Sequence, residues 1–200
     1  MNISSYDIII VGAGLAGLCL ALSIQHLPLK ILLLDAKPEP RFTSHQNPED
    51  IRAIALSIGS QQLLSQWGIW STLENQACPI RQVHISDQGH FGISRIEAED
   101  DHVPALGYVI PITQLIQTFQ SEIPKQKKIN LEIRRPQEVV ALTSCSRVTT
   151  LTLKREDEMT MVQAPLILSA DGQNSTLARL LKIKKTEKDY RQWAVVANIG

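Results

Sequence analysis

A glycine-rich turn between an apolar strand and an apolar helix constrains the fold of this chain more than any other feature. Residues 7–12 read Asp-Ile-Ile-Ile-Val-Gly, a β-branched run typical of a central parallel strand that is buried on both faces. Residues 14–27 are rich in leucine and alanine, and Pro28 follows them, which predicts a helix that ends there. A second apolar run occupies residues 30–35. Strand, helix and strand in this order predict a βαβ unit.

The turn matches the Gly-x-Gly-x-x-Gly fingerprint of dinucleotide-binding proteins, and each glycine has its own role. Gly12 makes the tight turn, Gly14 lets the backbone approach a pyrophosphate, and Gly17 lets the helix pack closely on the strands. Asp35 ends the second strand, where an acid can accept hydrogen bonds from an adenosine ribose and disfavours a ribose 2′-phosphate. We therefore predict a bound dinucleotide; the alternative is a glycine-rich turn without a ligand.

The rest of the chain does not continue as the alternating helices and parallel strands of a simple NAD dehydrogenase. Residues 36–50 contain three prolines and predict a long loop. Apolar and polar residues alternate in three later segments, which predict an antiparallel meander: 137–143, 147–154 and 159–163. The apolar run 166–170 then leads into Asp171-Gly172, a second acid–glycine turn at a strand's carboxyl end. Such a turn suits a long ligand across the sheet edge and favours FAD over NAD.

The fold class predicted from these patterns is α/β, a Rossmann-like FAD-binding domain with a central parallel sheet and an antiparallel meander. It would be joined to the start of a β-sheet substrate domain. The remaining predicted helices are 57–67, 113–123 and 175–181, and the remaining predicted strands are 80–86, 91–97, 106–112, 129–133 and 193–200.

Composition excludes several other classes of protein. Twenty basic and twenty acidic residues leave no net charge, which argues against a nucleic-acid binder and against a polybasic membrane anchor. Cys19, Cys78 and Cys145 are odd in number and lack Cys-x-x-Cys spacing, so we expect a reducing cytoplasmic setting without a disulfide framework or zinc module. The uncharged stretch 8–29 is interrupted by glycines and a proline and is not expected to span a membrane. The histidines near Asp87 fit no strong ligand spacing, so no metal site is predicted.

Six segments of the chain resemble the class A flavoprotein aromatic hydroxylases, and more closely their ubiquinone-biosynthesis branch, the 2-polyprenyl-6-methoxyphenol hydroxylases. The segments are 7–17, 52–57, 83–90, 105–107, 170–172 with Ser175, and 194–198. The first and fifth are shared by many flavoproteins, whereas 52–57, 83–90 and 194–198 are more specific to this branch.

The resemblance implies an FAD-dependent monooxygenase that uses NAD(P)H and O2 to hydroxylate a polyprenylated phenol. The flavin would carry the chemistry, so no catalytic side chain is predicted. The glycines of the turn would hold the pyrophosphate and Asp35 the adenosine ribose. Arg52 would lie along the flavin and its phosphates, and Asp171 near the ribityl–pyrophosphate region. The alternatives are a surface salt bridge for Arg52 and a turn or cap role for Asp171.

The chain also departs from the pattern of that family. Asp35 stands where glutamate is commoner, and its side chain is one methylene shorter. Ala178 stands where the family has an arginine, with Arg179 next to it, and Pro111-Ile-Thr replaces Glu-Asn-Arg. The sequence lacks the family's later Gly-Asp-Ala-x-His-like segment, so we expect an excerpt or a truncated product. By itself it would bind FAD weakly or not at all and would not hydroxylate a phenol.

The resemblance also implies a domain layout and a cellular setting. Residues 1–80 would form the FAD-binding βαβ unit and its following helix, and 81–112 the first substrate-domain strands. Residues 113–182 would return to the FAD-binding domain with the meander, and 183–200 would begin a second substrate-domain segment. We expect a cytoplasmic protein, compatible with peripheral association at the inner membrane and with other ubiquinone-biosynthesis proteins as partners. Two alternatives stay open: another FAD or NAD oxidoreductase, and a non-catalytic dinucleotide-binding fragment.

Overall fold

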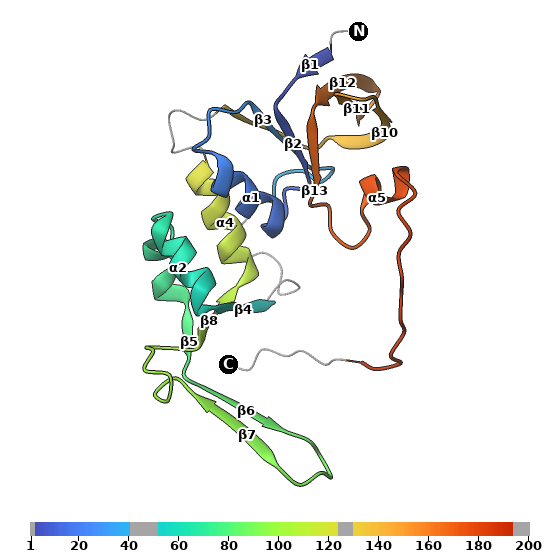
Figure 1. Cartoon of the computed structure of the whole chain (residues 1–200). Coiled ribbons are helices and arrows are strands. Elements are labelled where there is room, and N and C mark those ends of the chain that lie inside the picture. The colour runs from blue at the N-terminus through green and yellow to red at the C-terminus, as the bar shows by residue number, and fades with distance from the viewer. Residues whose placement is uncertain (1–2, 41–51, 124–129, 194–200) are drawn as a thin grey trace. The chain divides into compact units, whose positions relative to one another are not determined.

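The computed structural model describes residues 3–40, 52–123 and 130–193 (Figure 1). The chain divides into two units: unit 1 comprises residues 1–44 and 123–200, and unit 2 comprises residues 45–122. The finer division of the chain at residues 80, 112 and 182 stays a prediction.

A four-stranded parallel sheet forms the centre of unit 1. Its strands lie in the order β13 (Leu166–Ser169), β2 (Ile8–Val11), β3 (Ile31–Leu34) and β9 (Leu131–Arg134). All three neighbouring pairs are parallel. The two central strands are almost wholly buried, as their uncharged Ile- and Leu-rich sequences predict. The βαβ prediction and the return of the chain to this sheet are therefore confirmed.

Helix α1 (Leu15–Ile24) contacts β2 and β3. Its buried residues are Gly17, Leu18, Ala21 and Leu22. The helix ends three residues before the predicted end at Leu27. A residue that precedes proline is disfavoured in the helical conformation. Leu27 precedes Pro28 and is therefore an unfavourable last residue for the helix.

The predicted meander is confirmed and forms a second sheet in unit 1. Strands β10 (Glu138–Ser144), β11 (Thr149–Arg155) and β12 (Glu158–Ala164) pair antiparallel in chain order. A short strand that the sequence did not predict, β1 (Ile3–Ser5), adds to β12 in parallel. Its three residues have too little apolar character to be recognised without the partner strand.

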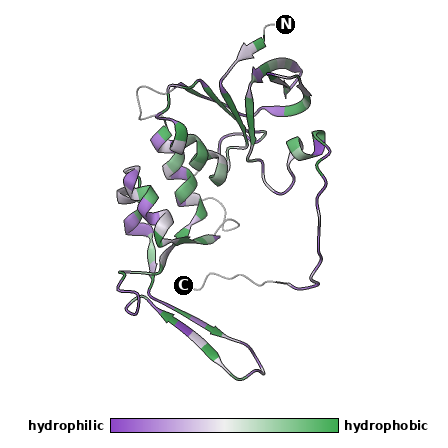
Figure 2. Cartoon of the chain, in the orientation of Figure 1, coloured by the Kyte–Doolittle hydropathy of each residue, from purple (hydrophilic) through white to green (hydrophobic). Residues whose placement is uncertain are grey.

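The core of unit 1 lies between the parallel sheet and the meander. Side chains from β2 and β3 meet side chains from the meander and one from α5 (Thr176–Leu180); they include Ile9, Val11, Leu32, Leu34, Leu151, Leu153, Val162 and Leu177. Figure 2 shows β2 and β3 as hydrophobic stretches, whereas hydrophobic and hydrophilic residues are mixed in the meander. Because α1 contacts the same parallel strands, their carboxyl ends are held in fixed positions at one edge of the sheet.

Unit 2 contains short helices and antiparallel strands. Its helices are α2 (Ile58–Gln66), α3 (Trp70–Leu73), the 3₁₀ helix η2 (Glu74–Gln76) and α4 (Ile112–Glu122). Its strands are β4 (Ala53–Ser57), β5 (Cys78–Ile80), β6 (Gln82–Ser86), β7 (Ile93–Glu97) and β8 (Gly107–Pro111). They form a three-stranded sheet in the order β4-β8-β5 and a β6–β7 hairpin.

Two local predictions in unit 2 can be compared with the structure. Ser57, the first residue of the predicted helix 57–67, caps α2, because its hydroxyl oxygen accepts a hydrogen bond from the Ser60 N–H at 3.2 Å. Thr113, the first residue of the predicted helix 113–123, instead lies inside α4, which follows β8 without an intervening cap residue.

The strand predicted at 193–200, in unit 1, lies outside the described residues except for Trp193, which has no regular structure.

A candidate dinucleotide-binding cleft

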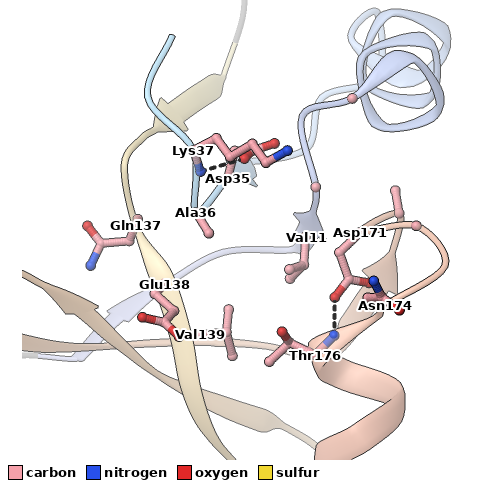
Figure 3. Close-up of a pocket in the computed structure, with 14 residues that line it drawn as sticks. Val11, Asp35, Ala36, Lys37, Gln137, Glu138, Val139, Asp171, Asn174 and Thr176 are labelled. Atoms are coloured by element: carbon pink, nitrogen blue, oxygen red, sulfur yellow. Dashed lines mark hydrogen bonds between the residues drawn. The ribbon is translucent and has the colours of Figure 1, made fainter. Parts of the chain in front are cut away.

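A cleft of about 370 Å³ opens at the carboxyl ends of three parallel strands of unit 1 (Figure 3). The residues that directly follow β2, β3 and β13 line it, and the first residues of β10 complete the lining. In open parallel sheets this edge is where ligands bind, because loops from several strands converge there.

The backbone at Gly12 and Gly17 requires glycine for the fold itself. Gly12 has a φ of +108°, and a Cβ atom there would lie 2.4 Å from the carbonyl oxygen of Ala170. A Cβ at Gly17 would lie 1.8 Å from the Gly12 carbonyl oxygen. These two glycines allow α1 and the turn after β13 to approach the glycine-rich turn at residues 12–17 closely. This turn is called the phosphate-binding turn below, after the fingerprint that it matches.

Gly14 is different, since the fold does not require its missing side chain. Its φ is −74°, and an added Cβ would meet no protein atom within 4 Å. The residue is exposed and lines the cleft, so the space beside it belongs to the cleft. A glycine that the packing does not demand leaves room for a ligand at the point where the fingerprint places the pyrophosphate.

The start of α1 supplies the polar groups that an anion needs. Gly14 is the N-cap residue, no side chain caps the helix, and the first turn contains no acidic residue. The first backbone N–H groups of a helix have no partner within it, and the helix dipole adds positive character at that end. Open space and N–H donors at one helix start fit the pyrophosphate of a dinucleotide.

Asp35 links the phosphate-binding turn to the loop that follows β3. Its Oδ2 atom accepts a hydrogen bond from the Ala13 N–H at 2.6 Å, and its Oδ1 atom accepts one from the Lys37 N–H at 2.8 Å. Each carboxylate oxygen can accept a further hydrogen bond. The Asp35 carboxylate therefore holds the turn in place and still has lone pairs that can accept hydrogen bonds from a ligand in the cleft.

Asp171 lines the opposite part of the cleft and organises the start of α5. Its Oδ1 atom accepts from the Ser169 hydroxyl at 2.5 Å, and its Oδ2 atom accepts from the Thr176 N–H at 2.6 Å (Figure 3). Burial raises the pKa of Asp171, but hydrogen bonds from Ser169, Ser175 and Thr176 outweigh this effect and hold the pKa below its usual value. These contacts support the start of α5, whose N-cap residue is Ser175, and they fit the turn or cap role that the sequence offered as an alternative; a direct contact with a ligand stays a prediction.

The structure brings together the predicted site residues that belong to unit 1. Gly12, Gly14, Asp35 and Asp171 line one cleft, and Gly17 packs beneath its turn. Arg52 belongs to unit 2, where it precedes β4 and its carbonyl oxygen accepts from the Ile112 N–H at 2.9 Å.

Arg179, which stands next to the position of the family's arginine, does not line this cleft. It lies on α5 and borders a separate hollow together with Asn174 and Lys185. Ala178 borders the same separate hollow, and the described residues that line the cleft include no arginine.

Sequence reasoning missed several residues that line the cleft. Lys37 could have been found, because it stands two residues after the predicted ribose acid. Gln137, Glu138 and Val139 at the start of the meander carry no local signal, since only the packing of the second sheet brings them to this edge. Among the described residues, no group of His, Cys, Asp and Glu side chains is arranged to hold a metal ion. No described helix has the length and hydropathy needed to cross a membrane.

Two curated proteins show how far the sequence similarity extends. The 3-demethoxyubiquinol 3-hydroxylase of Escherichia coli is 27% identical over 195 residues, which cover 96% of this chain and 48% of that protein. Ubiquinone hydroxylase UbiM of Neisseria meningitidis is 30% identical over 200 residues, which cover 96% of this chain and 41% of that protein. The chain thus spans less than half the length of these relatives.

Solved structures share the fold. The OxyS anhydrotetracycline hydroxylase of Streptomyces rimosus superposes with a TM-score of 0.76 and 21% identity, over 92% of this chain and 35% of that protein. The sequence model of the FAD binding domain family FAD_binding_3 matches residues 5–199. The phosphate-binding turn, the acid after β3 and this match agree, and the chain belongs to the family of FAD binding domains, with FAD as its dinucleotide.

Proposed function

We propose that this chain is the FAD-binding part of an aromatic-ring monooxygenase that hydroxylates a polyprenylated phenol in ubiquinone biosynthesis. The observation that carries the cofactor site is the cleft at Gly14, where open space adjoins the N–H groups at the start of α1. The substrate class rests on the names of the relatives, which are hydroxylases of ubiquinone or its precursors. NAD(P)H and O2 are the co-substrates that this class of enzyme uses.

The residues of the cleft would bind and orient FAD, which when bound supplies the redox chemistry. The backbone N–H groups around Gly12 and Gly14 would hold the pyrophosphate, with Gly17 keeping α1 close behind the turn. Asp35 would accept hydrogen bonds from the adenosine ribose through its remaining lone pairs. Asp171 would lie toward the ribityl–pyrophosphate region, and Arg52 of unit 2 along the flavin.

The domain layout and the cellular setting follow from the same proposal. Residues 81–112 and 183–200 would belong to the substrate domain, with the remaining residues in the FAD-binding domain. A polyprenylated substrate partitions into membranes, so the protein would act in the cytoplasm at the surface of the inner membrane. It would do so together with other proteins of ubiquinone biosynthesis.

The cofactor is tested by titrating the protein that carries this chain, freed of bound flavin, with FAD and with NAD in parallel, using flavin fluorescence and calorimetry. We expect FAD to bind more tightly than NAD, because the cleft extends from the turn after β2 to the second acid–glycine turn after β13. We also expect Asp35→Ala to weaken FAD binding roughly ten- to hundredfold through lost hydrogen bonds to a charged group. Asp7→Ala is the matched control, since the Asp7 Oδ2 atom also accepts from a backbone N–H, that of Lys30, outside the cleft. Tighter binding of NAD than of FAD would overturn the assignment.

The reaction is tested in the protein that carries this chain, supplied with NADH or NADPH, a polyprenylated phenol and isotopically labelled O2. A monooxygenase transfers one labelled oxygen atom to the phenol, which mass spectrometry detects. Oxidation of the phenol without incorporation of label would favour the alternative of a different flavin oxidoreductase.

A further inference from the structure

The charges that line the cleft are poorly matched to an anionic ligand. Among the described lining residues, the acidic side chains are Asp35, Glu138 and Asp171, whereas Lys37 is the one basic side chain. Hydrogen bonds keep the pKa of Asp171 low, so this carboxylate is ionised at neutral pH. A pyrophosphate that enters this cleft therefore meets repulsion from carboxylates, which the N–H groups of α1 must offset.

Lys37 is held at the place where a positive charge would reduce this repulsion. Its backbone N–H donates to the Asp35 Oδ1 atom at 2.8 Å, so the residue is tied to the acid expected to bind the ribose. Figure 3 shows its side chain extending alongside Asp35. The side chain is exposed, and no described carboxylate forms an ion pair with its ammonium group.

We propose that Lys37 is a further FAD-binding residue, whose ammonium group contacts an anionic phosphate oxygen in the adenosine diphosphate half of the cofactor. This inference rests on the proposed function, because it places the pyrophosphate at Gly14. The long flexible side chain carries a compact charge that can approach a phosphate oxygen from the β3 side of the cleft. Lys37 would then favour phosphate-bearing ligands over uncharged nucleosides.

The test compares ADP with adenosine as probes for the protein that carries this chain, freed of bound flavin, by calorimetry at low and high salt. We expect Lys37→Met to weaken ADP binding about five- to tenfold at low salt, and to leave adenosine binding within about twofold. Lys37→Arg should retain ADP binding, and Lys37→Glu should weaken it further than Lys37→Met does. The difference between wild type and Lys37→Met should shrink at high salt, because screening weakens a charge–charge contact at an exposed site.

Lys154→Met is the matched control, since Lys154 lies on β11 of the same unit, is exposed and does not line the cleft. It removes the same charge and should leave ADP binding unchanged. Circular dichroism melting of each variant confirms that the fold is retained.

The outcomes separate this inference from the proposed function. If Lys37→Met binds ADP as wild type does while Asp35→Ala binds it weakly, the role of Lys37 is wrong and the cleft assignment stands. If Lys37→Met weakens ADP and adenosine alike, Lys37 shapes the loop and does not contact a phosphate, which also overturns the proposal. If wild type binds neither ADP nor FAD, both proposals fail together.

Discussion

Asp35 combines a structural role in the turn after β2 with a predicted role in binding the ribose. Its side chain is one methylene shorter than that of glutamate, and both of its carboxylate oxygens accept backbone hydrogen bonds. The carboxylate therefore fixes the phosphate-binding turn before a ligand arrives. Recognition of the ribose and positioning of the pyrophosphate would thus depend on the same residue.

Gly12 and Gly14 lead to a further prediction, because the fold requires a glycine at position 12 but not at position 14. We expect Gly12→Ala to destabilise the protein by roughly 1–3 kcal/mol or more, since alanine at a φ of +108° is strained and its Cβ would collide with the Ala170 carbonyl. Gly14→Ala should melt as wild type does but bind FAD more weakly. Thermal melting monitored by circular dichroism, followed by FAD titration at a temperature where both variants are folded, checks the contrast. Equal melting temperatures for the two variants would contradict it.

At the scale of elements, the start of α5 is held by two side chains that act together. The Asp171 carboxylate accepts from the Thr176 N–H, and the Ser175 hydroxyl accepts from the Ala178 N–H at 3.0 Å. The same carboxylate lines the cleft. Anchoring of this helix and the shape of the cleft are therefore linked through one residue.

This link predicts a pH dependence. The pKa of Asp171 is lower in the folded protein than its usual value of 3.8, so its contribution to stability is present above that value. It is lost as the pH falls through the lowered pKa. We expect Asp171→Asn to be less stable than wild type in urea unfolding at pH 7, and the difference to shrink at pH values below about 4. Ser57→Ala, which removes an uncharged cap from α2, should show a similar stability loss at both pH values; a constant difference for Asp171→Asn as well would refute the prediction.

At the scale of the whole molecule, the sequence predicted what local patterns determine. The parallel strands, the glycine-rich turn between β2 and α1 and the meander follow from apolar runs, glycines and alternation, and all were found. Strands β1 and β4 and the cleft residues Glu138 and Val139 were missed, because their positions depend on pairing and packing between distant segments. The placement of Arg52 on the flavin was inferred from family resemblance and stays a prediction.

Tyr6 connects the two sheets of unit 1 at a place remote in sequence from its partners. Its N–H donates to the Gln163 carbonyl of β12 at 2.9 Å, and its hydroxyl donates to the Glu132 carboxylate of β9 at 2.5 Å. Arg134 donates to the same hydroxyl at 2.7 Å. The side chain is buried in the core that joins the sheets. Loss of this connection should therefore weaken the packing of both sheets.

The hydroxyl group of Tyr6 also gives a prediction for alkaline conditions. Burial first, and then the hydrogen bond to Glu132, raise the pKa of Tyr6 to about 12 from an ordinary value of 10.0. The stability that this residue contributes is fully present below pH 10 and is lost as the pH rises toward 12. We expect wild type to lose stability in that range in urea unfolding, and Tyr6→Phe to lose less, because it has no phenol to ionise. Parallel decline of the two proteins would show that the network has no such role.

The open space beside Gly14 has a consequence for experiments in living cells. A Cβ atom added at this residue would meet no protein atom within 4 Å, so we expect a substitution to alanine to keep the fold while it weakens cofactor binding. A protein altered only there should keep its fold and hold FAD more weakly. Comparing it with a deletion would separate the defects that arise from lost redox activity from those that arise from a missing component of an assembly.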